Sequence, residues 1–167
     1  MIENLDETDI RILQLLQENA RLTNYQIGEK LNKTATPILV RIRKLEEMGF
    51  IKGYMAVLNH EKIGRSLMAF IHVQIRDHSL EDFEHFEREM IGLDEVLECY
   101  HMTGEYDFIL RVAVKDLKVY HDFLMNKLFK TLPKIKILTT LVMREAKREA
   151  GFPLPVPREK HHRKTAS

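Results

Sequence analysis

The side chains with the clearest chemical capacity lie between residues 33 and 45. Lys33, Arg41, Arg43 and Lys44 fall in this stretch, which contains no acidic residue. A local cluster of positive charge attracts phosphate groups even though the net charge of the chain is only +1. A helix with a solvated charged face would use the same residue types. The absence of acids favours nucleic-acid binding.

Residues typical of enzymes and metal sites form no recognisable pattern. The 8 histidines are scattered, apart from the pair at 161–162, and no HExxH or HxH spacing occurs. A Gly-rich phosphate loop and a GxSxG motif are also missing. Cys99 is the only cysteine and falls in a predicted strand, where a small core residue is expected. We therefore expect no catalytic residue, no metal and no cofactor.

Three short helices must position the basic cluster. Apolar spacing and capping residues predict helices over about 7–19, 23–31 and 34–49. Asp6 and Thr23 are the expected N-caps of the first two, and Thr34 is the expected N-cap of the third. Pro37 falls in the first turn of the third helix, where its missing N–H breaks no helical bond.

The third helix has an apolar face and a basic face. Ile38, Ile42 and Leu45 share the inner face, so that Arg41 and Lys44 are expected to point outward and Arg43 to lie on a flank. Two short helices and a tight turn after a supporting helix form a helix-turn-helix, whose last helix reads DNA. The candidate DNA-binding residues are Lys33, Thr34, Thr36, Pro37, Arg41, Arg43 and Lys44.

The rest of the chain predicts a second, mixed domain. A strand-like stretch at 51–58 leads into a polar linker that ends near residue 66. Strands at 67–76, 95–103, 106–115 and 135–143 and helices at 80–91 and 117–129 then give the order βαββαβ. This order predicts a ferredoxin-like fold, and the whole chain is of the α+β class.

One face of the predicted sheet lacks a cover. Both helices belong on one face, but the opposite face also carries apolar residues, which include Phe70 and Ile109. A second copy of the chain is the economical cover. We expect a homodimer.

The organisation along the chain is therefore a winged-type helix-turn-helix domain over 1–52, a strand and linker over 53–66, a second domain over 67–147 and a tail over 148–167. The tail from residue 148 contains three prolines and four basic residues after residue 157, and we expect it to be mobile. Without a signal sequence or a long apolar run, the expected location is the cytoplasm, on the nucleoid and away from membranes.

Several motifs together resemble those of the Lrp/AsnC, or feast/famine, family of transcription regulators. The resemblance is greatest to the leucine-responsive branch of this family. The resemblance covers residues 5 to about 147. It is carried by Leu5-Asp6 with Asp9, Ile12-Leu13, Ala20-Arg21, Thr34 with Thr36-Pro37, Arg41-Ile42, Leu45-Glu46, Gly49 with Ile51, Gly53-Tyr54, and Thr103-Gly104 with Asp107.

The resemblance implies partners and a second site. Members of the family bind double-stranded DNA, form dimers through the ferredoxin-like RAM domain and commonly assemble into octamers. Their effectors, usually amino acids, bind between RAM domains. The corresponding effector residues here are Thr103, Gly104, Asp107, Thr139, Thr140 and Leu141. The family's pattern thus implies an amino-acid-responsive regulator.

Two other functions remain open on this fold. Siroheme decarboxylases share the two-domain architecture, and such an enzyme would bind a tetrapyrrole and ignore DNA. An architectural protein would wrap DNA with little sequence preference, and its affinity would fall steeply with salt. The basic third helix favours the regulator over the enzyme.

Overall fold

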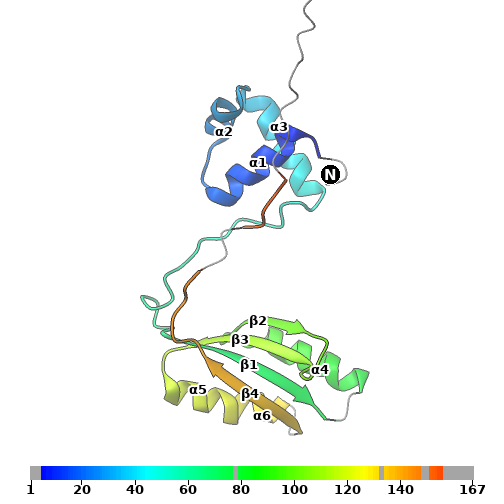
Figure 1. Ribbon diagram of the computed structural model, residues 1–167, viewed down its shortest axis with the longest axis vertical. Helices are drawn as coiled ribbons and strands as arrows, with labels where there is room; N and C mark the ends of the chain where they lie inside the picture. Colours follow the sequence, from blue (N-terminus) through cyan, green and yellow to red (C-terminus); the bar gives the residue numbers. More distant parts are fainter. Residues whose placement is uncertain (1–4, 77–78, 132–133, 148–150, 156–167) are drawn as a thin grey trace, which may run out of the picture. The chain divides into compact units, whose positions relative to one another are not determined.

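The computed structural model describes residues 5–76, 79–131, 134–147 and 151–155. The chain divides into two compact units, Met1–Ala56 with Lys147–Ser167 and Val57–Ala146. The first unit is helical and the second is built on a sheet (Figure 1). Within the described ranges no helix is long and apolar enough to span a bilayer.

Three helices form the first unit: α1 (Glu7–Glu18), α2 (Asn24–Leu31) and α3 (Ala35–Glu47). Asp6 and Thr23 are the N-caps of α1 and α2, as predicted. In the structure each also forms a reciprocal capping box with the residue three positions on. The fully buried side chains of this unit include Ile12, Ile27 and Ile38. The predicted apolar faces of the three helices therefore meet in one core.

Two predictions for this unit are wrong. Residues 51–58 form no strand, and Met55 and Val57 are 86% and 70% exposed. A strand needs a neighbour to receive its hydrogen bonds, and no described segment pairs with this one. Residues 151–155, which we expected to be mobile, lie against α1 instead: Leu154 packs on the helical core. The remainder of the expected mobile tail, 148–150 and 156–167, is outside the described residues.

The second unit follows the predicted βαββαβ order. Its strands are β1 (Leu67–Ile75), β2 (Val96–His101), β3 (Phe108–Val114) and β4 (Ile135–Leu141). Helix α4 (Leu80–Ile91) joins β1 to β2. The connection from β3 to β4 is a continuous helical segment with three parts: α5 (Leu117–Phe123), a π-helical turn η1 (Leu124–Leu128) and α6 (Phe129–Thr131). Ser79 and Asp116 are the N-caps of α4 and α5, and the side chain of each accepts a backbone N–H from the residue three positions on.

The sheet is antiparallel and has the strand order β2-β3-β1-β4. Its helices cover one face, where Phe86, Met90 and Phe123 are buried against Ile71 and Phe108 (Figure 1). This burial follows the period-2 alternation of the central strands. The ferredoxin-like prediction is confirmed.

The other face of the sheet is partly apolar and has less cover. Leu138 is 49% exposed and Tyr100 is 55% exposed, and Phe70 and Ile109 are half-buried. Two polar atoms on this face, Nδ1 of His72 and Nε of Arg111, are buried yet have no hydrogen-bond partner in the part of the chain that the structure describes. Buried polar atoms normally have partners, so this face has the character of an incomplete interface.

Candidate nucleic-acid interface and effector site

The start of α3 presents a run of exposed polar side chains. Lys33, Thr34, Thr36 and Pro37 are all exposed at this end of the helix. Further along, Arg43 and Lys44 are exposed, and Val40 is 61% exposed between the two groups. Apart from Arg41, every residue predicted to contact DNA is therefore open to an external ligand.

The hydroxyl of Thr34 has an unusual position. Thr34 is the N-cap of α3, as predicted, but its side chain makes no capping hydrogen bond. One of the two usual donors is missing: an N-cap oxygen accepts from the N–H of the second or third helical residue, and the third residue here is Pro37, which has no N–H. Thr34 is thus exposed at the positive end of the helix dipole, where anions are stabilised.

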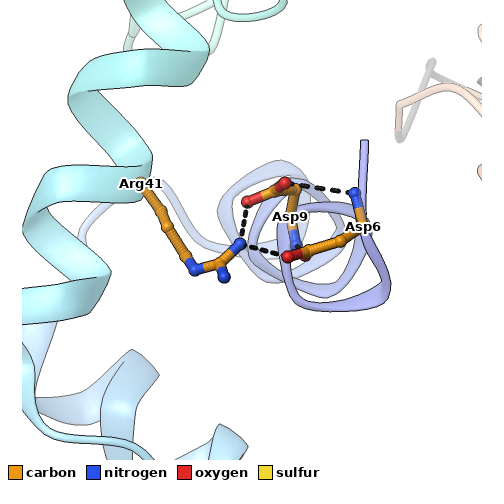
Figure 2. A network of polar contacts seen from close by, with 3 residues as sticks. All are labelled: Asp6, Asp9 and Arg41. Atoms are coloured by element: carbon orange, nitrogen blue, oxygen red, sulfur yellow. Dashed lines mark hydrogen bonds and ion pairs between the residues drawn. The ribbon is translucent and has the colours of Figure 1, made fainter. Parts of the chain in front are cut away.

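Arg41 does not point outward, and this prediction is wrong. Its Nη1 donates to Oδ2 of Asp6 at 2.6 Å and to Oδ1 of Asp9 at 2.7 Å (Figure 2). A helix turns by about 100° per residue, so Arg41 lies only about 60° from the buried Ile38, whereas Arg43 lies about 140° away. Arg41 is therefore directed along the flank of α3 towards the start of α1.

The carboxylates of this cluster serve two helices at once. Asp6 and Asp9 each accept a backbone N–H of the capping box and also the guanidinium of α3. Burial acts to raise the pKa of Asp6, but the Asp9 amide and the Arg41 guanidinium outweigh it and the pKa is lowered. The bonds to Asp9 and then Asp6 raise the pKa of Arg41. Asp6 and Arg41 are therefore both charged at neutral pH, and the cluster ties α3 to α1.

Sequence reasoning missed this role of Asp6 and Asp9. The sequence indicates Asp6 as an N-cap and Asp9 as an acid in the first helical turn, and neither role gives a reason to look for a third member. The signal that could have found it is the angle of Arg41 on α3, which is closer to the core than to the outer face.

The loop between β2 and β3 contains the first half of the predicted effector site. Thr103 and Gly104 are exposed, and Gly104 has a φ of 126°, a conformation that favours glycine. Asp107 has a structural role: its Oδ2 accepts the backbone N–H of Ile75 at 2.7 Å, and its own N–H donates to Val73. Asp107 thus extends the β1–β3 ladder past its last backbone pair.

The second half of the predicted site lies on β4, on the other side of β1. Thr139 and Thr140 pair with Ile71 and Phe70, whereas β3 begins at Phe108, which pairs with Val73. Strands β3 and β4 are two strand spacings apart across β1, and the paired positions differ by two residues along β1. The loop half and the β4 half of the predicted site are therefore about 12 Å or more apart. Thr139 is turned to the helices, where its hydroxyl bonds that of Tyr120 at 2.7 Å. Within one copy the two halves do not meet.

Thr140 and Leu141 are the exposed members of the β4 group, and Leu141 is 42% exposed.

Among the described residues, no group of three or more His, Cys, Asp and Glu side chains is placed to hold a metal ion. Burial, followed by the charge of Glu87, raises the pKa of the Cys99 thiol to about 11. A thiol with this pKa is a poor nucleophile at neutral pH.

Comparison with known proteins assigns both units. The family model of the Lrp/AsnC ligand binding domain matches residues 68–152, and that of a winged helix-turn-helix DNA-binding domain matches residues 5–52. These matches cover the sheet-based unit and the three helices in turn.

Curated relatives and solved structures agree with this assignment. The Bkd operon transcriptional regulator of Pseudomonas aeruginosa is 36% identical over 124 residues, 74% of this chain and 81% of that protein. The leucine-responsive regulatory protein of Escherichia coli is 32% identical over 149 residues, 89% and 90% of the two chains. A Neisseria meningitidis transcriptional regulator solved with L-Met has a TM-score of 0.84 and 34% identity, covering 90% of this chain and 97% of that one. The chain belongs to the Lrp/AsnC family of transcription regulators.

Proposed function

We propose that α3 enters the major groove of double-stranded DNA and gives this regulator its sequence preference. The observation that carries the proposal is the exposed, acid-free surface from Lys33 to Lys44 on the last helix of a helix-turn-helix. The exposed hydroxyl of Thr34 and the helix N-terminus suit a phosphate. Thr36, Pro37 and Val40 form the surface that faces base edges, and Arg43 and Lys44 suit phosphates.

Arg41 has a different place in this proposal. Its guanidinium is held by two carboxylates, so it acts as a positioning residue that fixes the angle of α3 on α1. The other candidates, Lys33, Thr34, Thr36, Pro37, Arg43 and Lys44, remain the proposed contacts to DNA.

The outer face of the sheet is proposed to bind a second copy of the chain. Two observations support this role. A second sheet would bury the half-exposed side chains of Leu138 and Tyr100. It would also offer hydrogen-bond partners to the unsatisfied atoms of His72 and Arg111. We propose further assembly of dimers, up to an octamer, from the resemblance to the family. Two reading helices in each dimer would face half-sites about one or more turns of DNA apart.

An amino-acid effector is proposed to bind where two copies bring the loop of one against β4 of another. The separation of about 12 Å within one copy supports a site shared between copies. The relative solved with L-Met supports the ligand class. The groups open to such a ligand are Thr103 and the Gly104 backbone on one side and Thr140 and Leu141 on the other. Asp107 and Thr139 are engaged with Ile75 and Tyr120, so they hold these groups in place.

The test is a DNA-binding selection with a genomic fragment library, repeated with a panel of amino acids and followed by particle size. We expect enrichment of a limited set of fragments and a change of affinity or size with at least one amino acid. Retention of all fragments alike, with affinity lost steeply as salt rises, would replace regulation by DNA wrapping. A chain that binds a tetrapyrrole and no DNA would be the enzyme instead, and we propose that this chain is not one.

Two variants then separate the two sites. Arg43→Ala should weaken DNA binding for all sequences and leave the response to the amino acid intact. Thr140→Val should blunt the response to the amino acid and leave DNA binding without effector unchanged, since Thr140 is exposed and far from α3 in the sequence. An undiminished response in Thr140→Val would remove β4 from the effector site. We place this activity in the cytoplasm, on the nucleoid.

A further inference from the structure

The C-terminal segment 151–155 makes specific contacts with α1. The side-chain amide of Gln17 pairs with the backbone of Phe152 on both sides: the Phe152 N–H donates to Oε1 at 2.7 Å, and Nε2 donates to the Phe152 carbonyl at 3.2 Å. One glutamine therefore satisfies the two hydrogen-bonding groups of one backbone residue. This is the pattern by which an extended peptide is recognised along its main chain.

An apolar contact accompanies the hydrogen bonds. Leu154 packs against the core of the helical unit, two residues after Phe152. Together with Phe152 it forms part of the wall of a groove of about 370 Å³, whose other apolar walls include Leu13, Leu16 and Phe50. Residues 50–55, which follow α3 and form no strand, supply the far side of this groove.

Gly151 fits this arrangement in a way that other residues would not. Its φ is +109°, which disfavours residues with a side chain. A methyl group at this position would also lie 2.6 Å from Oε1 of Gln17, which is the atom that accepts the Phe152 N–H. The backbone at 151 and the amide of Gln17 are thus matched to each other.

A cluster of positive charge follows the docked segment in the sequence. Arg158, Lys160, Arg163 and Lys164 come after Leu154 with Glu159 as the one acid among them. Arg158 comes four positions after Leu154, and an extended chain covers at most about 3.5 Å per residue. Docking of Leu154 therefore keeps Arg158 within about 14 Å of the helical unit, whatever path the chain takes.

We propose that residues 151–155 are an anchor that docks against α1 through Gln17 and the helical core, and that this anchor holds the basic C-terminal residues at the DNA-binding unit, where they add contacts to DNA phosphates. The proposal rests on the DNA-binding function proposed above. Its physical basis is effective concentration: a tethered cluster of cations stays near the bound DNA, whereas an undocked tail spreads over a larger volume.

Docking itself is tested by hydrogen exchange at the Phe152 amide in the full-length chain. Gln17→Ala removes both hydrogen bonds from the α1 side, and Gly151→Ala disturbs the same contact from the segment side. Both should speed exchange at Phe152 to the rate of an unprotected amide. Gln14→Ala, the same change on the same helix but outside the groove, should keep wild-type protection. Equal exchange in all four proteins would show that the segment is not docked.

The contribution to DNA binding is measured from the salt dependence of affinity. Each phosphate contact adds about 0.9 to the slope, so glutamine replacement of the four basic residues should lower it by about 2 to 3 per subunit. In the Gln17→Ala and Gly151→Ala backgrounds the same replacement should lower it by less than about 1. An equal reduction with and without docking, or no reduction in the wild-type background, would overturn the anchor.

Arg43→Ala distinguishes failure of the anchor from failure of the proposed function. If Arg43→Ala weakens DNA binding while the tail replacement changes nothing, only the anchor is wrong. If the tail replacement lowers the slope only when the segment is docked and Arg43→Ala has no effect, the anchor stands and the role of α3 is wrong.

Discussion

Replacing Arg41 by alanine tests whether this residue positions α3 or touches DNA. The change removes two charge-assisted hydrogen bonds, of 2.6 Å to Asp6 and 2.7 Å to Asp9. The carboxylate of Asp6 is 51% exposed, so water and salt screen its share, and that bond contributes about 0.5 kcal/mol. Asp9 is only 13% exposed, and a hydrogen bond to a charged group in such a site contributes about 1.5 kcal/mol. The expected loss of folding stability is therefore about 2 kcal/mol.

Arg43→Ala is the matched control, because Arg43 is two residues away on the same helix and exposed. Substitution of an exposed side chain should change stability by less than about 0.5 kcal/mol. The two variants should then differ in the opposite sense when the salt slope of DNA binding is measured. Arg43→Ala should lower the slope by about 0.9, whereas Arg41→Ala should weaken binding with a slope change of less than about 0.3.

Acid supplies an independent check on the same cluster. The pKa of Asp6 is lowered in the folded chain, so its ion pair stabilises the fold above the pKa of the unfolded state and loses this effect as the pH falls through the folded value. The stability difference between wild type and Arg41→Ala should therefore be constant near neutral pH and shrink below about pH 4. Urea unfolding at a series of pH values measures it.

The result that would refute this reasoning is a wild-type stability for Arg41→Ala together with a slope that falls by about 0.9. Arg41 would then be a phosphate contact, and its carboxylate partners would be incidental. Asp6→Asn with Asp9→Asn would confirm that alternative by strengthening DNA binding, since the released guanidinium would then be available to phosphate.

Three further predictions concern other parts of the chain. Burial and then the bond from its hydroxyl to the Glu46 carboxylate raise the pKa of Tyr54 to about 12. Absorbance titration should therefore show one tyrosine ionising near pH 12, and Glu46→Gln should lower that pKa. Because the pKa is higher in the folded chain than in the unfolded one, the protonated Tyr54 stabilises the fold up to about pH 10, and this stabilisation is lost as the pH rises further. Cys99 should react with iodoacetamide at pH 8 about 100-fold more slowly in the folded chain than in urea, since its pKa is raised to about 11; equal rates would contradict its burial. Leu138→Asp should dissociate the proposed dimer in sedimentation experiments, whereas Leu117→Asp, at the start of α5 and 62% exposed, should not. Dimers that persist in both variants would exclude the outer face of the sheet as the interface.

Local chemistry explains which parts of the fold could be predicted. The caps at Asp6, Thr23, Ser79 and Asp116 are set by residues three positions apart, and the structure has all four. The alternation along β1 and β3 likewise determines which side chains face the helices. The βαββαβ order leaves few right-handed arrangements, and the observed strand order is one of them.

The errors arise where a residue's partner is distant in the sequence. Helix periodicity places Arg41 about 60° from Ile38, on the flank of α3, and a long arginine side chain can turn from there to either side. The carboxylates 32 and 35 residues earlier decide the direction. Residues 51–58 have the composition of a strand and lack a strand beside them within the described chain. The effector residues were grouped by family motif, and the register of β1 with both neighbours shows that one copy separates them.

The docked segment shows why some contacts leave no trace in a sequence. Gln17 binds the backbone of Phe152, and a backbone N–H and C=O are present at nearly every position, so the identity of residue 152 carries no information about the contact. The Phe152 side chain is in fact 75% exposed. Only Gly151 and Leu154 are constrained, one by its φ and one by its packing, and two residues are too few to form a periodic pattern. A chain segment held through its main chain must therefore be found in the structure.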